Sequence, residues 1–134
     1  MIALDTSVVI AAFATWHESH AIAAAALSDR PALPAPCALE VYVVLTRLPP
    51  PHRAAPALVR DLLAATFPAE PLAMPAAATS DLVETLVRHG VSGGASYDAV
   101  IGLVASHAGA TLLTLDRRAR LTYERIGATS RLLA

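Results

Sequence analysis

The stretch "ATLLTLDRR" at Ala110–Arg118 is an apolar run that ends on an aspartate, and "MIALDTS" at Met1–Ser7 repeats this pattern at the start of the chain. Short apolar runs bounded by turn or helix signals predict buried strands. Because ligands bind beyond the carboxyl ends of the strands in an open α/β sheet, Asp5 and Asp116 are expected at the binding edge of one sheet. Each aspartate also suits the N-cap of the helix that follows it, so the pattern alone leaves both roles open.

The rest of the chain alternates short apolar segments with helical patterns. Strands are expected at Ile2–Asp5, near Ala32–Pro34, near Pro71–Met74, at Thr111–Leu115 and near Ser130–Leu133. Helices are expected at Ser7–Ala14, His17–Leu27, Pro36–Leu48, Ala54–Thr66, Thr79–His89, Ser96–His107 and Arg117–Ile126. This alternation predicts an α/β fold with a parallel sheet. The 134 residues, of which 55% are apolar, contain no repeat and no linker, so we expect a single domain over residues 1–134.

The composition excludes several kinds of chemistry. The chain contains no Lys, Asn or Gln, which rules out a Walker A lysine, a Schiff base and the reading of adenine by a side-chain amide. The net charge of −1 gives no overall nucleic-acid footprint. Five of the ten arginines nevertheless fall in the last eighteen residues, as either a phosphate-binding patch or a solvated final helix.

The sequence also bears on the location of the protein. No apolar run reaches the roughly 18 residues that a bilayer-spanning helix needs, so no membrane association is expected. Cys37 is the single cysteine, so no disulfide forms within the chain. A protein of this kind is expected in a reducing cytoplasm.

Two further acids lie on helical faces that are otherwise apolar. Glu40 shares its face with Val43 and Val44, three and four residues further on, and Asp98 shares its face with Ile101. Acids in such places are expected to be partly buried. Both also suit the first turn of a helix, where the helix dipole favours a carboxylate, and each stretch alone leaves this simpler role open.

Taken together, the four acids favour a metal site. Burying several carboxylates near one another is unfavourable unless a cation neutralises them. A site made of carboxylate oxygens, without obligatory His or Cys, suits Mg²⁺ or Mn²⁺ rather than zinc. Such an ion activates water and stabilises a phosphoryl oxyanion, which favours phosphodiester hydrolysis. The four predicted site residues are Asp5, Glu40, Asp98 and Asp116.

With these four acids, the chain resembles the PIN-domain ribonucleases, and among them the VapC toxins of bacterial toxin–antitoxin pairs. Four segments carry the resemblance from end to end: "IALDTSVVIAAF", "ALEVYVVLTRL", "SYDAVIGLVASHAGATLLTLDRRA" and "TYERIGATSRLL". The resemblance implies a three-layer α/β/α domain with a five-stranded parallel sheet. It implies a metal-dependent endoribonuclease of the bacterial cytoplasm that cleaves structured RNA such as tRNA or rRNA. It further implies a VapB-type antitoxin, whose C-terminal segment covers the acidic groove, and a homodimer.

The acids of this family fall on the four residues already singled out. Asp5 and Asp116 are expected as direct metal ligands, because strand ends are rigid. Asp98 is expected to share a metal, directly or through water, and Glu40 to orient or deprotonate the attacking water. The competing interpretation is a catalytically silent PIN-type module that binds RNA or protein without cleaving it. Intact acids count against that interpretation.

Hydroxyls and arginines complete the expected site. Thr6 and Thr114 match family positions beside the first and last acids, where they either contact the metal, its water or the substrate, or cap turns and helices. Capping is the expected role of Ser7. The arginines expected to hold RNA are Arg47, Arg117 and Arg118.

Other polar and aromatic residues are given structural roles. Phe13, Trp16 and Tyr42 are expected in core packing rather than at an interface. The segment "HESH" at His17–His20 lacks the spacing of a zinc motif, so its histidines are expected at the surface.

Overall fold

The computed structural model describes all residues from 1 to 134 and contains one parallel sheet. Its strands are β1 (Ile2–Leu4), β2 (Thr111–Thr114) and β3 (Ser130–Leu132), in the order β1-β2-β3. The central strand pairs with both neighbours in parallel, and the two strands that precede the aspartates are adjacent. The carboxyl ends of β1 and β2 therefore lie side by side, as the repeated pattern predicts.

The sheet has three strands instead of the expected five. The segments expected as strands at Ala32–Pro34 and Pro71–Met74 each retain only a single bridge position. Ala32 pairs with Ala3, and Pro34 pairs with Leu72, both in parallel. Proline has no backbone N–H, so it cannot continue a ladder of hydrogen bonds, and the pairing at this edge ends after one position.

Helices form at all seven expected places, with shifted ends. In chain order they are α1 (Thr6–Phe13), α2 (His20–Ala26), the 3₁₀ turn η1 (Leu27–Asp29), α3 (Ala35–Arg47), α4 (Pro56–Thr66), α5 (Ala76–Ser80), α6 (Leu82–Arg88), α7 (Ala95–His107) and α8 (Arg117–Arg125). The segment expected as one helix at Thr79–His89 is divided between α5 and α6 at Asp81. None of the helices combines the length and the apolar composition that a membrane-spanning segment requires.

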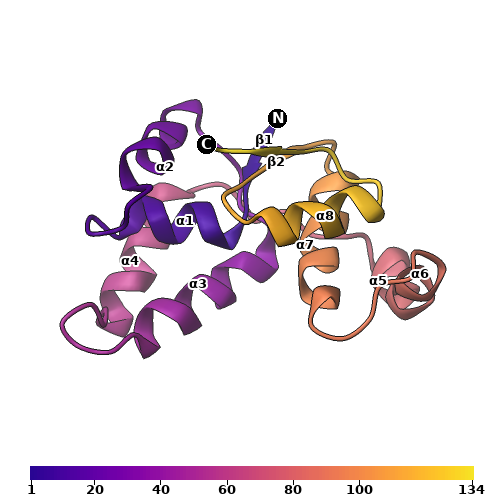
Figure 1. Cartoon of the computed structure of the whole chain (residues 1–134), viewed down its shortest axis with the longest axis horizontal. Helices are drawn as coiled ribbons and strands as arrows, with labels where there is room; N and C mark the ends of the chain where they lie inside the picture. Colours follow the sequence, from indigo (N-terminus) through magenta and orange to yellow (C-terminus); the bar gives the residue numbers. More distant parts are fainter.

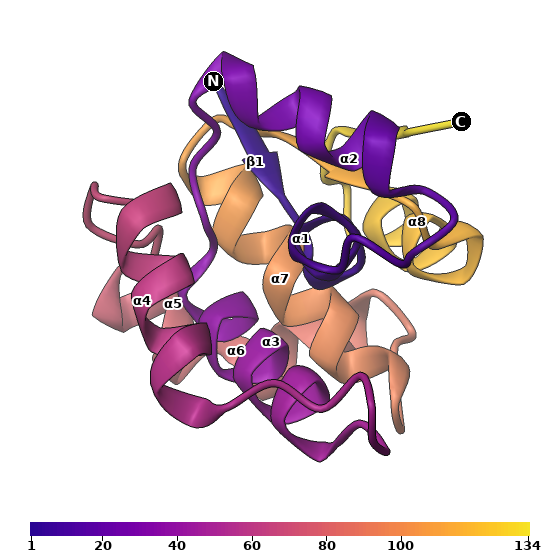
Figure 2. The same cartoon turned by 90° about the vertical axis from the view of Figure 1, so that its left-hand side faces the viewer.

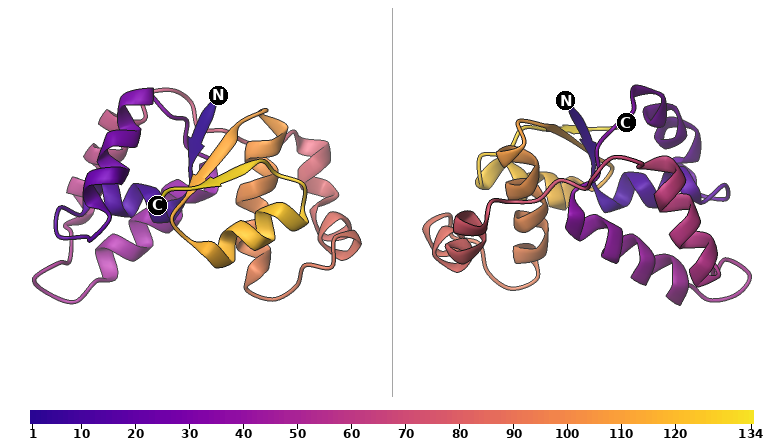
Figure 3. Two further views of the ribbon diagram at one scale, coloured as in Figure 1. Left: turned by 45° about the horizontal axis from the view of Figure 1, so that its top comes forward. Right: turned by 180° about the vertical axis from the view of Figure 1, so that it is seen from behind.

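The sheet lies between two groups of helices. Figure 1 shows the first half of the chain, with α1 to α4, on one side of β1 and the second half, with α5 to α8, on the other. The strand β2 contacts α1 from the first group and α7 and α8 from the second. Figure 2 shows α3 and α7 side by side below the sheet, and Figure 3 shows all three strands between the two groups.

The core joins the sheet to the helices that carry the four acids. The largest fully buried side chains include Leu4, Leu112 and Ile101, from β1, β2 and α7. Gly102 lets α8 approach α7 closely, because a Cβ at this position would lie 3.0 Å from the ring of Tyr123. This close approach brings the Tyr123 side chain under the carboxyl ends of the strands.

Candidate active site

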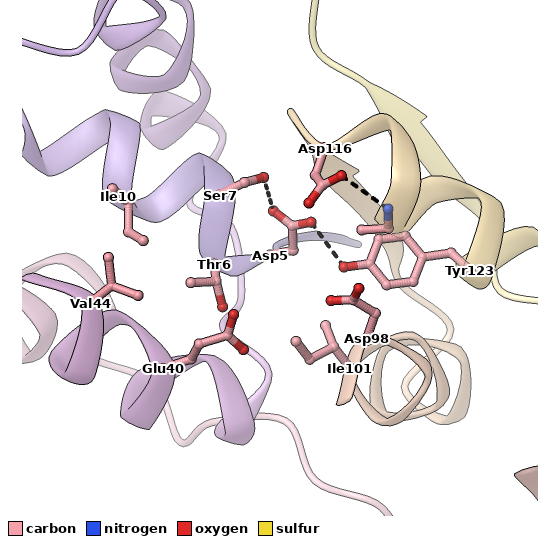
Figure 4. Close-up of a pocket in the computed structure, with 11 residues that line it drawn as sticks. Asp5, Thr6, Ser7, Ile10, Glu40, Val44, Asp98, Ile101, Asp116 and Tyr123 are labelled. Atoms are coloured by element: carbon pink, nitrogen blue, oxygen red, sulfur yellow. Dashed lines mark hydrogen bonds between the residues drawn. The ribbon is translucent and has the colours of Figure 1, made fainter. Parts of the chain in front are cut away.

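One pocket at the carboxyl ends of β1 and β2 is lined by all four predicted acids (Figure 4). Asp5 follows β1, Asp116 follows β2, Glu40 comes from α3 and Asp98 comes from α7. The pocket has a volume of about 180 Å³, several times the space that one water molecule takes. Four elements that are distant in sequence thus direct carboxylates into the same small space.

Asp5 is almost fully buried, with 3% of its surface exposed. Its Oδ1 accepts hydrogen bonds from the Ser7 hydroxyl at 2.5 Å and the Val8 N–H at 3.3 Å, and its Oδ2 accepts one from the Tyr123 hydroxyl at 2.9 Å. Burial raises the pKa of Asp5, and the hydrogen bonds from these neighbours and Thr114 oppose that shift. Because the Val8 contact is an N-cap, Asp5 both caps α1 and faces the pocket.

Ser7 connects the two strand ends. Its hydroxyl donates to Asp5 and accepts a hydrogen bond from the Leu115 N–H at 2.9 Å. It also lies 3.4 Å from the Thr114 hydroxyl. The expectation that Ser7 caps a helix is wrong, because Asp5 is the N-cap of α1 and Ser7 instead bridges segments 108 residues apart.

Asp116 is exposed and bonded differently. Its Oδ1 accepts hydrogen bonds from the N–H groups of Arg118 and Ala119, at 2.9 and 3.1 Å, and so caps α8. Its Oδ2 has no hydrogen-bond partner. The fully buried Thr114 accepts a hydrogen bond from the Asp116 N–H at 3.0 Å, which holds the backbone that carries the acid.

The two acids on helices, Glu40 and Asp98, are half-buried, and the negative charges of other carboxylates contribute to their raised pKa values. Burial, followed by the negative charges of Asp116, Glu40 and Asp5, raises the pKa of Asp98 to about 6. Burial and the charge of Asp5 likewise raise the pKa of Glu40. Several carboxyl groups with raised pKa values in one cleft are typical of functional sites.

Thr6 presents a hydroxyl to the pocket without a hydrogen-bond partner. The residue is 6% exposed, and its Oγ1 is buried and unpaired. Figure 4 shows this hydroxyl next to the Glu40 carboxylate. The Thr6 hydroxyl lowers the pKa of the Glu40 carboxyl, so it faces the acids of the pocket, whereas Asp5 caps the helix.

The donor set of the pocket suits a hard divalent cation. It consists of carboxylate and hydroxyl oxygens, without His or Cys. In the conformation described, no three acidic, His or Cys side chains stand close enough together to enclose one ion. The Ser7 and Tyr123 hydroxyls already engage both oxygens of Asp5, so an ion bound to Asp5 would share it with them.

The three predicted RNA-binding arginines lie on two sides of the acids. Arg117 and Arg118 line a groove that also contains Asp116. Arg47, at the end of α3, lines a different groove that contains Glu40. All three arginines are exposed, and none forms a salt bridge.

Sequence reasoning missed or misplaced several aromatic residues. Tyr123, which donates to Asp5, lies four residues after Ala119 on the buried face of α8. A tyrosine on an apolar helical face needs a hydrogen-bond partner for its hydroxyl, and this requirement is the sequence signal that indicates a role for Tyr123. Phe13 packs against the core as expected, whereas Trp16 and Tyr42 are 48% and 38% exposed, so the expectation of core packing is wrong for both.

The histidines of "HESH" are partly exposed. His20 makes a 2.9 Å hydrogen bond from Nδ1 with the carbonyl of Ala11 in α1. His17 accepts a hydrogen bond at Nδ1 from the Ser19 N–H. These local contacts agree with the expected surface location.

Comparison with known proteins gives the family. The model of the PIN domain matches residues 2–125. The chain is 52% identical over 126 residues to Ribonuclease VapC40 of two Mycobacterium tuberculosis strains, CDC 1551 / Oshkosh and ATCC 25618 / H37Rv, which covers 94% of each chain. It is 42% identical over 127 residues to Ribonuclease VapC27 of the H37Rv strain, covering 94% of this chain and 92% of that protein.

A solved structure shares the fold. The crystal structure of FitAcB from Neisseria gonorrhoeae matches 97% of this chain and 96% of its own chain, with a TM-score of 0.65 and 18% identity. At this level of identity, the match shows a shared fold only. The family model and the mycobacterial relatives go further: this chain belongs to the PIN-domain family and, within it, to the VapC group.

Proposed function

We propose that this protein is a metal-dependent endoribonuclease and the toxin of a VapBC-type toxin–antitoxin pair. It hydrolyses phosphodiester bonds of structured RNA, such as tRNA or rRNA, and so inhibits translation. The observation that carries the proposal is the convergence of Asp5, Glu40, Asp98 and Asp116 in one pocket at the strand ends. The relatives named as VapC ribonucleases, at 52% and 42% identity, support the same class of activity.

The carboxylates would hold Mg²⁺ or Mn²⁺ through Asp5, Asp98 and Asp116, with Glu40 beside them. Such an ion, when bound, supplies a Lewis acid for the phosphoryl oxygen and makes water a better nucleophile. Glu40, with its raised pKa, orients or deprotonates the attacking water. Attack at phosphorus with departure of the 3′ oxygen leaves a 3′-hydroxyl and a 5′-phosphate.

The hydroxyls have separate roles in this proposal. Thr6, whose Oγ1 is buried and unpaired in the pocket, contacts the water or the substrate. Thr114 holds the backbone of Asp116, and Ser7 ties that segment to Asp5. Arg47, Arg117 and Arg118 bind phosphates of the RNA on either side of the acids.

The same proposal includes partners and location. Leu39, Val43 and Tyr97 are exposed apolar side chains, and they line a groove that also contains Glu40 and Asp98. A VapB-type antitoxin bound here would cover the acids, and we propose a homodimer as the form of the toxin.

A single domain over residues 1–134 in the bacterial cytoplasm agrees with the one core and the free buried cysteine. Light scattering on the purified protein tests the homodimer.

The first experiment compares the wild type with Asp5→Asn on total bacterial RNA. Asp81→Asn is a matched control, because Asp81 is an exposed acid on the far helices and makes no capping contact. The proposal expects discrete fragments from the wild type and Asp81→Asn in Mg²⁺ or Mn²⁺, and none in EDTA or from Asp5→Asn. Cleavage by Asp5→Asn would reject the site, and absence of cleavage by all folded proteins would favour a silent binding module.

A further inference from the structure

The Tyr123 hydroxyl reaches the acid pocket from within the core. Tyr123 lines the pocket, although only 1% of its surface is exposed. Its hydroxyl donates to Asp5 Oδ2 at 2.9 Å, and Figure 4 shows the ring extending from α8 toward that carboxylate. A phenylalanine would fill nearly the same space without bringing a polar atom into the core. Packing alone therefore does not explain the hydroxyl, whereas its contact with a pocket acid does.

The packing of α7 against α8 fixes the position of this tyrosine. Gly102 lies four residues after Asp98 on α7, so the two residues share one face of that helix. A Cβ at Gly102 would lie 2.8 Å from Ile126 Cδ1 and 3.0 Å from Tyr123 Cδ1, so the glycine leaves room for the tyrosine ring. The ring thus packs against the face of α7 that carries Asp98. One helix sets the places of a pocket acid and of the tyrosine together.

The hydrogen bonds of Asp5 engage its two oxygens unequally. An ionised carboxylate has about four lone-pair positions, shared equally between its oxygens. Oδ1 accepts hydrogen bonds from the Ser7 hydroxyl at 2.5 Å and from the Val8 N–H at 3.3 Å, which use both of its positions. Oδ2 accepts one hydrogen bond, from Tyr123, so a position on this oxygen remains for a cation. Asp5 held in this way offers a cation one oxygen instead of two.

We propose that Tyr123 is a positioning residue, whose hydroxyl holds the Asp5 carboxylate so that the acid presents a single oxygen, Oδ2, to the pocket cation. The inference rests on the proposed function, because it takes Asp5 as a ligand of a hard divalent cation. It adds that the hydrogen bonds of Asp5 select the ion. Mg²⁺ and Mn²⁺ suit an octahedral shell of single oxygens, whereas Ca²⁺ accepts a flexible shell in which one carboxylate can supply both oxygens.

Binding of Mn²⁺ and Ca²⁺ to the metal-free protein tests the inference without RNA. The electron paramagnetic resonance signal of free Mn²⁺ gives the Mn²⁺ affinity, and displacement of Mn²⁺ by Ca²⁺ gives the Ca²⁺ affinity. Tyr123→Phe removes the hydroxyl and keeps the ring. We expect this variant to bind Mn²⁺ about 10- to 100-fold more weakly, the usual range when a hydrogen-bond partner of a metal ligand is lost. Ca²⁺ binding should weaken less, so the preference for Mn²⁺ over Ca²⁺ should fall.

A second variant opens the other oxygen of the same acid. Ser7→Ala removes a donor to Asp5 Oδ1, which frees a position on that oxygen and lets the carboxylate offer both. The preference for Mn²⁺ over Ca²⁺ should therefore fall in this variant too. If Tyr123→Phe did not fold, the change of preference in Ser7→Ala would decide the inference alone.

Controls separate this role from a loss of fold. Tyr42→Phe makes the same chemical change at a tyrosine that does not line the pocket, and it should leave both affinities unchanged. Asp5→Asn should lose more Mn²⁺ affinity than Tyr123→Phe, because it replaces the charged ligand itself. Circular dichroism at the temperature of the titration checks that each variant is folded.

Two results would overturn the inference: an unchanged Mn²⁺ affinity in folded Tyr123→Phe, or an equal loss of Mn²⁺ and Ca²⁺ affinity in the folded variants. The second result would indicate a general loosening of the pocket. Metal-dependent cleavage of total RNA by the wild type would in either case keep the proposed function and remove only the positioning role. The expected shifts in metal affinity without any cleavage by the wild type would have the opposite meaning. They would support the role of Tyr123 and reject the nuclease.

Discussion

Asp5 and Asp116 occupy equivalent places after adjacent parallel strands, yet their surroundings differ. Asp5 is 3% exposed, and side-chain hydroxyls from Ser7 and Tyr123 engage its two oxygens. Asp116 is exposed, caps α8 with one oxygen and leaves the other free. One acid is therefore fixed in a buried network, while the other keeps an oxygen available to a ligand without rearrangement.

The largest expected effect is on the rate of RNA cleavage, and it differs between the two acids. Asp5→Asn should reduce cleavage by at least about 10³-fold, as loss of a central catalytic group does. Asp116→Asn should reduce it less, by about 10- to 100-fold, because water can replace an exposed ligand and asparagine still caps the helix. Single-turnover rates on one RNA substrate in Mg²⁺ measure both. Equal losses in the two variants would mean that burial does not distinguish their roles.

The contacts behind this difference show what the sequence reveals and what it does not. An apolar run that ends on an acid is a local pattern, so both strands and both aspartates were predictable. The partners of Asp5 were not, because the Tyr123 hydroxyl comes from 118 residues away and the Leu115 N–H bound by Ser7 lies 108 residues from it. No local periodicity encodes such pairs. Proline in the edge segments likewise ended two expected strands that the apolar pattern alone favoured.

The next effect concerns the network around Asp5. Tyr123→Phe removes the hydroxyl that donates to Oδ2 in a buried place, which should lower the free energy of unfolding by about 2 kcal/mol. The loss should be greater where Asp5 is ionised than where it is protonated, because the hydroxyl then donates to a charged oxygen. Urea unfolding at several pH values measures it. Tyr97→Phe, at a residue 76% exposed, is the control and should have no effect. A loss in Tyr123→Phe that did not vary with pH would mean that Asp5 keeps one protonation state across the range measured.

The capping role of Asp116 predicts a smaller effect. Asp116→Ala removes the acceptor for the N–H groups of Arg118 and Ala119 and should cost about 1 kcal/mol of stability. Asp116→Asn keeps that acceptor and should cost almost nothing. Chemical unfolding of both variants without divalent cations separates the cap from any metal contribution. Equal stability of the two variants would show that the exposed cap does not stabilise α8.

The smallest expected effect is on the pH dependence of stability, and it concerns an acid on a helix instead of one at a strand end. The pKa of Asp98 is raised to about 6 by burial and then by the charges of Asp116, Glu40 and Asp5. The folded protein therefore holds a proton on Asp98 that the unfolded chain has released, so this residue lowers stability as pH rises from about 4 to about 6. Because Asp98 is only half-buried, solvent screening reduces the effect to less than about 1 kcal/mol.

Asp98→Asn should thus stabilise the metal-free protein above pH 6 and flatten its stability between pH 4 and pH 6, as thermal unfolding across that range measures. Mg²⁺ should remove the advantage, since a cation in the pocket favours the ionised wild-type acid. A variant that was less stable than the wild type at neutral pH without metal would show that the carboxylates do not repel one another in the folded state. The acids would then be neutralised within the chain itself, and their burial together would not call for a cation.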